Sequence, residues 1–413
     1  MSSKGKSSAK MGVGTALVPK LRFPEFRDSK GWKETSLQKL ARPVTDRATT
    51  GDADNVLSLS GEHGLVLQSD YFGKKVAGDN TGRYLKIRKN DFVYNDRATK
   101  ASSFGTIKRL SNYGGGIVSP IYKCFRFQPS ESPAFWEWYF ESGSHDPALG
   151  GLVNEGARAG RFNISVTQFL STNAWRPEEP EQQKIAGCLD SVDALIAAQG
   201  RKVEALRAYK KGLMQQLFPQ EGETQPRLRF PEFERAEEWE EATVEEIIVT
   251  ITPPKKLQTS DYQSEGAFPI VDQSQDYICG WTNDGDAVVN KRLPVIVFGD
   301  HTCALKFVDR PFVQGADGIK ILEPKRGINV RFLFYALEAN PITQESYKRH
   351  FSVLREKKLS FPDPKSGEQQ RIADCFTSLD DLITAESQKL DTLKTHKKGL
   401  MQQLFPLVGE DDA

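Results

Sequence analysis

The chain lacks the residue patterns that mark several classes of protein. Its five cysteines are odd in number, widely spaced and never arranged as CxxC, which argues against a disulfide framework and against a zinc site. No apolar run approaches the roughly 20 residues of a membrane helix, and the Ser/Lys/Gly-rich start has no signal-peptide core. We therefore expect a soluble cytoplasmic protein with reduced thiols and no membrane contact.

A strong net charge is also missing. The formal charge of the 413 residues is +1, with 27% charged and 38% hydrophobic residues. Such a chain can bury ordinary cores and is long enough for two or three domains. Because an average over the whole chain hides local patches, the charge has to be examined segment by segment.

What the sequence contains is a duplication, which has to be found before any element is assigned. The segment PKLRFPEF at 19–26 returns as PRLRFPEF at 226–233, and a tryptophan follows each copy at the same offset. Residues 181–219 return as residues 368–406, with 23 of 39 positions identical and no gap. The chain is therefore duplicated, and the inserts between the repeated segments are unlike each other.

Each long repeat is predicted to form one helix. Apolar residues such as Ile185 and Val192 recur every seven positions, and charged residues fill the other faces. About 36 helical residues would span roughly 54 Å, which is the length of a spacer. One polar residue, Gln199 or Glu386, interrupts each stripe at the same position, as polar core residues do in coiled coils to set register. We expect the two helices to pack together as an antiparallel coiled coil.

The end of the long repeat, KKGLMQQLFP, is unchanged in both copies. The apolar stripe alone is explained by a core seam, but a seam does not require identical polar residues. We therefore expect a shared docking surface for a partner. Its candidate residues are Lys210, Lys211, Gln215, Gln216, Lys397, Lys398, Gln402 and Gln403.

The inserts, roughly 33–175 and 240–361, have the pattern of mixed α/β domains with short strands. Apolar or alternating runs at 84–93, 117–127, 293–298 and 318–322 are bounded by Gly, Asn and Asp turn signals. Between Arg83 and Arg126 there are ten Lys or Arg and only two acidic residues. This local excess suits a groove lined by DNA phosphates, although a solvated strand edge is the plainer interpretation of the same residues.

Polar and basic residues at strand ends and in Gly-rich loops are the candidate DNA contacts. Asn pairs with adenine and Arg with guanine in bidentate hydrogen bonds, so Asn95, Arg97, Arg158 and Arg161 are candidates for base reading in the first insert. Gln273, Ser274, Asp300, His301 and Arg349 are their counterparts in the second. The other candidate DNA contacts are Arg83, Lys86, Lys100, Ser102, Lys108, Lys255, Lys306 and Lys357.

The residues from 84 to 109, YLKIRKNDFVYNDRATKASSFGTIKR, and from 114 to 127, GGGIVSPIYKCFRF, resemble the first half of a type I restriction-modification specificity subunit. LPVIVFGDHTCALKFVDRPFVQGADGIKIL at 293–322 is similar to other recognition domains of that family. NISVTQFLSTNAWRPEEPEQQKIAGCLDSVDALI and KKGLMQQLF stand where the family has its conserved helices. The resemblance extends over nearly everything from residue 19 to residue 406.

The resemblance implies a non-catalytic, DNA-reading subunit. Each insert would read one half of an asymmetric bipartite site in double-stranded DNA, and the helices would hold two modification (methyltransferase) subunits that methylate adenine. With two restriction (motor-nuclease) subunits, such a complex cuts unmodified DNA. S-adenosylmethionine, ATP and Mg would belong to those partner subunits, and this chain would bind no cofactor and no metal.

The expected fold is α+β: two α/β target recognition domains separated by two long helices, with approximate two-fold duplication. The expected segments are a tail (1–16), recognition domain 1 (17–175), a central spacer helix (176–219), recognition domain 2 (220–362), a C-terminal spacer helix (363–406) and an acidic tail (407–413).

An enzyme is the alternative from a different class. The only GKS, at 5–7, has no upstream glycine for a Walker A loop. The only Pro-Pro, at 253–254, lacks the Asn or Asp and the aromatic residue of an amino-methyltransferase, and Pro362-Asp363 has no Glu-x-Lys after it for a nuclease. Asp300, His301 and Cys303 lack a further ligand for a metal. Two non-enzymatic alternatives remain: a nucleic-acid-binding scaffold, and the specificity subunit of a related system that cuts on both sides of its site.

Overall fold

The computed structural model describes residues 17–49, 55–73, 81–99, 102–152, 162–220, 222–290, 292–316, 318–343 and 349–406. The chain forms two compact units: unit 1 is Met1–Ala198 with Leu390–Ala413, and unit 2 is Gln199–Lys389. Each unit contains one insert and a part of both long helices. The predicted division into recognition domains and spacer helices therefore differs from the division into compact units. It rests on expected function and stays a prediction.

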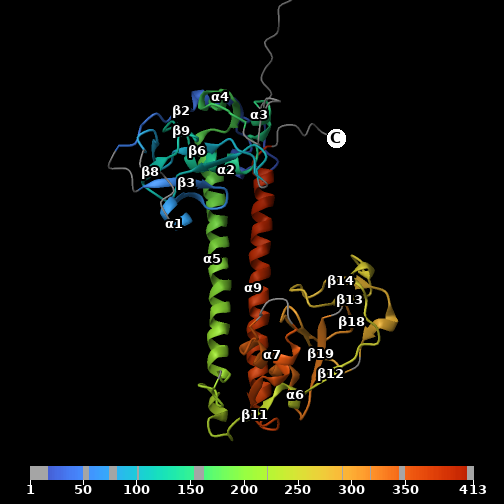
Figure 1. The fold of residues 1–413 in the computed structure, drawn as a ribbon. Coiled ribbons are helices and arrows are strands. Elements are labelled where there is room, and N and C mark those ends of the chain that lie inside the picture. The colour runs from blue at the N-terminus through green and yellow to red at the C-terminus, as the bar shows by residue number, and fades with distance from the viewer. Residues whose placement is uncertain are drawn as a thin grey trace, which may run out of the picture. The chain divides into compact units, whose positions relative to one another are not determined.

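The two long repeats are the helices α5 (Glu179–Leu217) and α9 (Glu368–Leu404). In unit 1 the start of α5 contacts the end of α9, with Lys397 Nζ 2.6 Å from Asp193 Oδ1. In unit 2 the Gln199 side chain donates to Glu386 Oε2 at 2.6 Å. The helices are therefore antiparallel (Figure 1), as expected, and the two polar interruptions of the stripes pair with each other.

Unit 1 contains two four-stranded sheets, of order β2-β9-β6-β7 and β4-β3-β8-β5, and the strand pair β1-β10. The strands are β1 (Lys33–Ser36), β2 (Ala41–Pro43), β3 (Val56–Ser60), β4 (Gly64–Leu67), β5 (Leu85–Arg88), β6 (Phe92–Asn95), β7 (Thr106–Arg109), β8 (Gly115–Val118), β9 (Lys123–Phe127) and β10 (Asn173–Arg176). The helices are α1 (Gln68–Phe72), α2 (Pro133–Glu141), α3 (Asp146–Gly150) and α4 (Val166–Ser171).

Unit 2 repeats this topology with sheets of order β12-β19-β16-β17 and β14-β13-β18-β15 and the pair β11-β20. The strands are β11 (Glu240–Thr243), β12 (Ile248–Ile251), β13 (Phe268–Val271), β14 (Gly280–Thr282), β15 (Val288–Val289), β16 (Val295–Gly299), β17 (Leu305–Val308), β18 (Phe312–Gln314), β19 (Ile319–Pro324) and β20 (Lys358–Phe361). The helices are α6 (Val244–Ile247), α7 (Val330–Ala339) and α8 (Phe351–Glu356). In both units one pair, β3-β8 or β13-β18, is parallel. The expected α+β fold is confirmed, with one mixed α/β insert in each unit.

Two of the expected strands are each divided. The run 84–93 holds β5 and the start of β6, separated by a turn in which Asn90 has a φ of 72° and Asp91 accepts from the Arg88 N–H at 2.9 Å. Asn tolerates this left-handed backbone better than most residues do. The run 117–127 likewise holds the end of β8 and all of β9. Hydrophobic patterning alone did not reveal these breaks.

The repeated PxLRFPEF segments join each domain to both long helices. Leu21 N–H donates to Gln403 O and Leu228 N–H donates to Gln216 O, both at 2.9 Å. The Arg22 guanidinium donates to Glu181 at 2.8 Å, and Arg229 donates to Glu368 at 2.9 Å. The first segment thus contacts the start of α5 and the end of α9, and the second makes the reciprocal contacts.

Aromatic side chains fill the core of unit 1 around α2. Trp32, Phe92, Phe125, Phe135 and Trp136 are fully buried there. In unit 2 the corresponding core centres on stacked Phe218 and Phe376 with Phe332. Both cores include residues of α5 and α9 as well as of the insert, so each recognition domain is packed on helix residues of its own unit. In the described part of the chain, no helix is long and apolar enough to cross a membrane.

Candidate nucleic-acid interface

The ends of β6 and β16 occupy the same place in the duplicated fold. Val93 of β6 pairs with Lys108 of β7, and Val297 of β16 pairs with Lys306 of β17. Counting onward from these pairs, Asp96 is equivalent to Asp300 and Arg97 to His301. Candidate DNA contacts selected separately in two unlike inserts therefore fall at one position of the fold, which we call the strand-end site.

In unit 1 the strand-end site opens onto a cavity of about 470 Å³. Asn95, Ser102 and Lys108 line it, so three of the predicted residues come together. Lys108 is one-fifth exposed, and its ammonium lies 3.1 Å from the Glu141 carboxylate of α2. Arg97 lies two residues after Asn95 in the chain, and its side chain is exposed. This arrangement offers an amide, a hydroxyl and two cations at a surface that DNA can reach.

Asp96 holds the chain behind this surface. Its carboxylate is buried, lies 2.7 Å from Lys123 Nζ and accepts from the Ile164 N–H at 3.0 Å. Its backbone oxygen accepts from the Phe162 N–H at 3.0 Å. Asp96 was not among the predicted site residues, although an acidic residue inside a strongly basic stretch was a signal that could have marked it.

In unit 2 Asp300 has the same role. It is 5% exposed, its carboxylate accepts from the Phe351 N–H at 2.8 Å, and its backbone oxygen accepts from the His350 N–H at 2.8 Å. These bonds give Asp300 a positioning role in the folded chain. The neighbouring His301 is half-buried and Arg349 is exposed, so both have surface that a base edge can contact.

Lys306 differs sharply from its equivalent Lys108. It is 5% exposed, and its ammonium donates to the backbone oxygens of Asp272 and Asp276 at 2.8 and 2.5 Å. Burial lowers the pKa of Lys306. Ser274 belongs to the same loop and donates from its backbone N–H to Asp272 Oδ1 at 2.8 Å. In this conformation Lys306 shapes the 272–276 loop and has little surface to offer to a phosphate.

Gln273, in that loop, has a buried amide oxygen without a hydrogen-bond partner among the described residues. It packs against Gly318, where a φ of +102° and a Gln273 oxygen 2.7 Å from an ideal Cβ position both require glycine. Because this oxygen is buried, it has no surface to offer to a base edge in this conformation.

A second basic cleft of about 460 Å³ lies beside β5 and β8 in unit 1. The predicted Lys86 lines it together with Arg88 and the three glycines 114–116. Lys86 and Arg88 are exposed on alternate positions of β5, and Arg88 has no ion-pair partner within the described residues. Arg88 was missed by sequence reasoning, although its spacing two residues after Lys86 places it on the same face of the strand.

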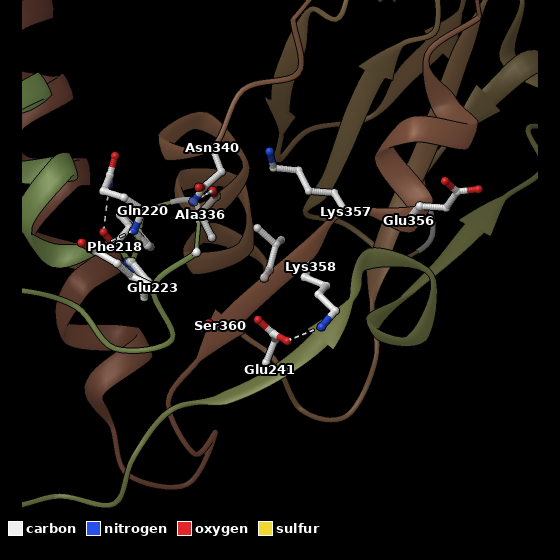
Figure 2. Close-up of a pocket in the computed structure, with 13 residues that line it drawn as sticks. Phe218, Gln220, Glu223, Glu241, Ala336, Asn340, Glu356, Lys357, Lys358 and Ser360 are labelled. Atoms are coloured by element: carbon white, nitrogen blue, oxygen red, sulfur yellow. Dashed lines mark hydrogen bonds and ion pairs between the residues drawn. The ribbon is translucent and has the colours of Figure 1, made fainter.

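The other predicted DNA contacts are scattered. Arg83 is exposed, and Lys255 pairs with Asp284 at 2.6 Å. Lys357 lines a cavity of about 450 Å³ near the end of α5. Figure 2 shows Lys358 directed at Glu241, 2.7 Å away, and Lys357 pointing away from that pair. Lys100, Arg158 and Arg161 lie outside the described residues.

The predicted docking residues divide into two kinds. Lys210 and Lys397, the first lysines of the two motifs, are 12% and 18% exposed and have ion pairs inside their own units. The remaining six are exposed. These six are Lys211, Gln215, Gln216, Lys398, Gln402 and Gln403.

Comparison with known proteins points to one family. Residues 236–395 match the model of the type I restriction modification DNA specificity domain. A type I restriction enzyme specificity subunit of Escherichia coli is 28% identical over 149 residues, which is 32% of this chain and 37% of that protein. One from Methanocaldococcus jannaschii is 25% identical over 259 residues, 55% of this chain and 60% of that protein. The matches thus span about a third to three-fifths of these relatives.

Solved structures share the fold over a larger part of the chain. The S subunit of a type I restriction-modification system from M. genitalium superimposes with a TM-score of 0.58 at 16% identity, covering 96% of this chain and all of the other. A chain from a structure on complex assembly and conformational transition of a type I restriction-modification system gives a TM-score of 0.52 at 16% identity, covering 91% of this chain and 97% of the other. At such identity the likeness concerns the fold.

Proposed function

We propose that the chain, which is similar to type I restriction-modification specificity subunits, is a non-catalytic subunit that reads DNA for a methyltransferase complex in the cytoplasm. Each recognition domain reads one half of a bipartite site in double-stranded DNA. The complex methylates adenine in both halves and, with motor-nuclease subunits, cuts unmodified DNA.

The observation that carries this proposal is the strand-end site, which occurs twice in one fold with different side chains. Asn95 and Arg97 stand in one unit where Gly299 and His301 stand in the other. Base readout depends on the donor and acceptor pattern of such side chains. Two domains of one topology with unlike strand ends therefore read unlike sequences, and the two half-sites differ.

The partners follow from the exposed residues of the repeated helix ends. Lys211, Gln215 and Gln216 on α5 recur as Lys398, Gln402 and Gln403 on α9, and packing gives no reason for their identity. Two copies of one surface bind two copies of one partner, which we take to be the modification subunit. S-adenosylmethionine belongs to that subunit, and ATP and Mg belong to two restriction subunits, so this chain needs no cofactor.

Methylome sequencing of a strain that carries the chain with its modification subunit tests the proposal. The expected result is an adenine methylated in each half of one bipartite motif, lost when the gene is deleted. Replacing residues 241–361 with the matching segment of a relative should change one half-site and leave the other intact. A change in both half-sites, or no bipartite motif at all, would contradict the modular assignment. Cleavage on both sides of the site would favour the related system instead.

A further inference from the structure

The first lysine of each KKGLMQQLFP motif is set apart from the rest of the motif by its surroundings. Lys210 and Lys397 are 12% and 18% exposed, whereas the lysines that follow them are exposed. This difference comes from the residues of the opposite helix and of the insert that pack against each first lysine.

In unit 2 three helices meet at Lys210. Its ammonium on α5 lies 2.8 Å from Asp380 Oδ1 of α9 and 3.1 Å from Glu338 Oε1 of α7. It also lies 5.2 Å from the ring centroid of Tyr335 of α7, and the Tyr335 hydroxyl donates to Asp380 at 2.9 Å. The recognition domain thus contributes an aromatic face and a carboxylate to a lysine of the helix pair.

In unit 1 a similar arrangement forms around Lys397, without a carboxylate from the insert. Its ammonium on α9 lies 2.6 Å from Asp193 Oδ1 of α5 and 4.3 Å from the ring centroid of Trp138 of α2. The Trp138 N–H donates to Asp190 of α5 at 2.8 Å. Asp193 and Asp380 are equivalent in the repeat, and Trp138 occupies on α2 the place of Tyr335 on α7.

The aromatic partner is what distinguishes these contacts from ordinary packing. The lysine and aspartate come from the repeated helices, but Trp138 and Tyr335 come from inserts whose sequences are unlike. An ammonium that contacts an aromatic face and a partly buried carboxylate together restricts the orientation of the insert helix against the long helices, and does not only hold the two in contact. Both inserts supply that face at the same position, so both domains take the same orientation on their helices.

We infer that Lys210 and Lys397 are positioning residues that set the angle of each recognition domain on the helix pair, and through it the gap between the half-sites that the complex accepts. This inference rests on the proposed function. It removes these two lysines from the surface that binds the modification subunits and leaves Lys211 and Lys398 on it. Because DNA repeats every 10 to 10.5 base pairs or so, a change of angle changes which gaps place both half-sites in register.

The double variant Lys210→Met with Lys397→Met tests this in the complete complex with its modification subunits. Methionine keeps an unbranched apolar stem and removes the charge. On a DNA library whose gap varies one base pair at a time, the variant should methylate the same half-site bases. Its preference for the native gap over neighbouring gaps should fall about tenfold, equivalent to about 1.4 kcal/mol. Co-purification of modification subunits should not change.

The double variant Lys211→Met with Lys398→Met is the contrast. It should weaken co-purification of modification subunits and leave the gap preference unchanged, and Arg201→Met, an exposed change on α5, should alter neither. Asp193→Asn with Asp380→Asn provides a second route should the methionine variant fold poorly, because it keeps the side-chain shape while weakening the lysine contact. Its gap preference should broaden in the same way.

A folded Lys210/Lys397 or Asp193/Asp380 variant with an unchanged gap profile would overturn the inference. So would loss of the modification subunits with the gap preference retained, since that result assigns the two lysines to docking. If the wild-type complex methylates no bipartite site, the proposed function fails, and the positioning role that rests on it is rejected as well.

Discussion

The two recognition domains share a strand order but hold the equivalent aspartate in different surroundings. Asp96 lies 2.7 Å from Lys123 Nζ of β9, whereas the equivalent Lys320 of β19 lies over the Phe351 ring, 5.4 Å from its centroid. Both aspartates nevertheless accept backbone N–H groups from the segment that follows later in the chain. The hydrogen bonds that the two aspartates accept from backbone N–H groups are kept, but within the described residues only Asp96 has a lysine beside it. One scaffold can therefore support different surfaces.

The units also differ in how deeply their shared ion pair is buried. The Arg22 and Glu181 side chains are 6% and 3% exposed, and those of Arg229 and Glu368 are 14% and 1% exposed. Each guanidinium also donates to two backbone oxygens of its own loop. The arginine of this motif is therefore less exposed to solvent in unit 1 than in unit 2. The two ion pairs should contribute differently to the free energy of unfolding.

The largest effect is expected from lengthening both helices together. Seven residues inserted between Arg201 and Glu204 of α5 need seven more between Thr384 and Ala385 of α9. Both the Gln199–Glu386 and the Lys210–Asp380 contacts are then kept. A heptad adds about 10.5 Å and preserves the apolar seam. Methylation at the native gap should be lost and should reappear at a longer gap, with the half-site bases unchanged.

Methylation of the gap library checks this expectation. Insertion into α5 alone is the control, and it should fail to assemble because the helix register is lost. A folded double insertion that retains the original gap would show that these helices do not set it.

The next effect compares the two buried ion pairs. Arg22→Met should lower the free energy of unfolding by about 3–5 kcal/mol, because it leaves the buried Glu181 carboxylate without its partner. Arg229→Met should lower the free energy of unfolding by less. The Arg229 guanidinium is more exposed, so water can take over part of its hydrogen bonding to Glu368. Urea denaturation of both variants gives the two values. Equal losses would mean that burial of the arginine does not govern the difference between the units.

A smaller effect separates the two strand-end aspartates. Asp96→Asn should destabilise by about 1–3 kcal/mol, since Lys123 loses its carboxylate partner, while Asp300→Asn should cost less than about 1 kcal/mol because an amide oxygen still accepts from the Phe351 N–H. Thermal unfolding measures both. Adding Lys123→Met to Asp96→Asn should recover part of the loss. If the double variant is less stable than Asp96→Asn alone, loss of the Asp96–Lys123 pair is not the cause of the destabilisation.

The smallest effect concerns the two cations of the strand-end site in unit 1. Arg97→Ala should reduce the slope of log affinity against log salt by about one, as expected for one lost phosphate contact. Lys108→Ala should reduce it less, because its ammonium already pairs with Glu141. Binding of a duplex over a range of salt concentrations measures both slopes, with exposed Lys39→Ala as the control. An unchanged slope for Arg97→Ala would remove this residue from the phosphate contacts.

Much of the architecture could be predicted from the repeats. The helices, their antiparallel pairing and the meeting of Gln199 with Glu386 all followed from periodicity and duplication. The strands at 84–93 and 117–127 were placed correctly but not divided correctly, because turn residues such as Asn90 act through backbone conformation. The candidate base-reading residues remain the least predictable part. A side chain at a strand end can contact a base only if it is exposed to solvent, and the sequence pattern of a strand does not predict that exposure.

The residues alone establish that this chain is a duplication with two long helices, two unlike inserts and a motif repeated without change. They do so because periodicity and identity are properties of the chain itself. Tertiary contacts decide which of the repeated polar residues face inward. Lys210 is buried by Asp380, 170 residues away, and by Glu338, 128 residues away. Identity in the repeat does not separate packed residues from exposed ones, whereas burial, which depends on such distant partners, does.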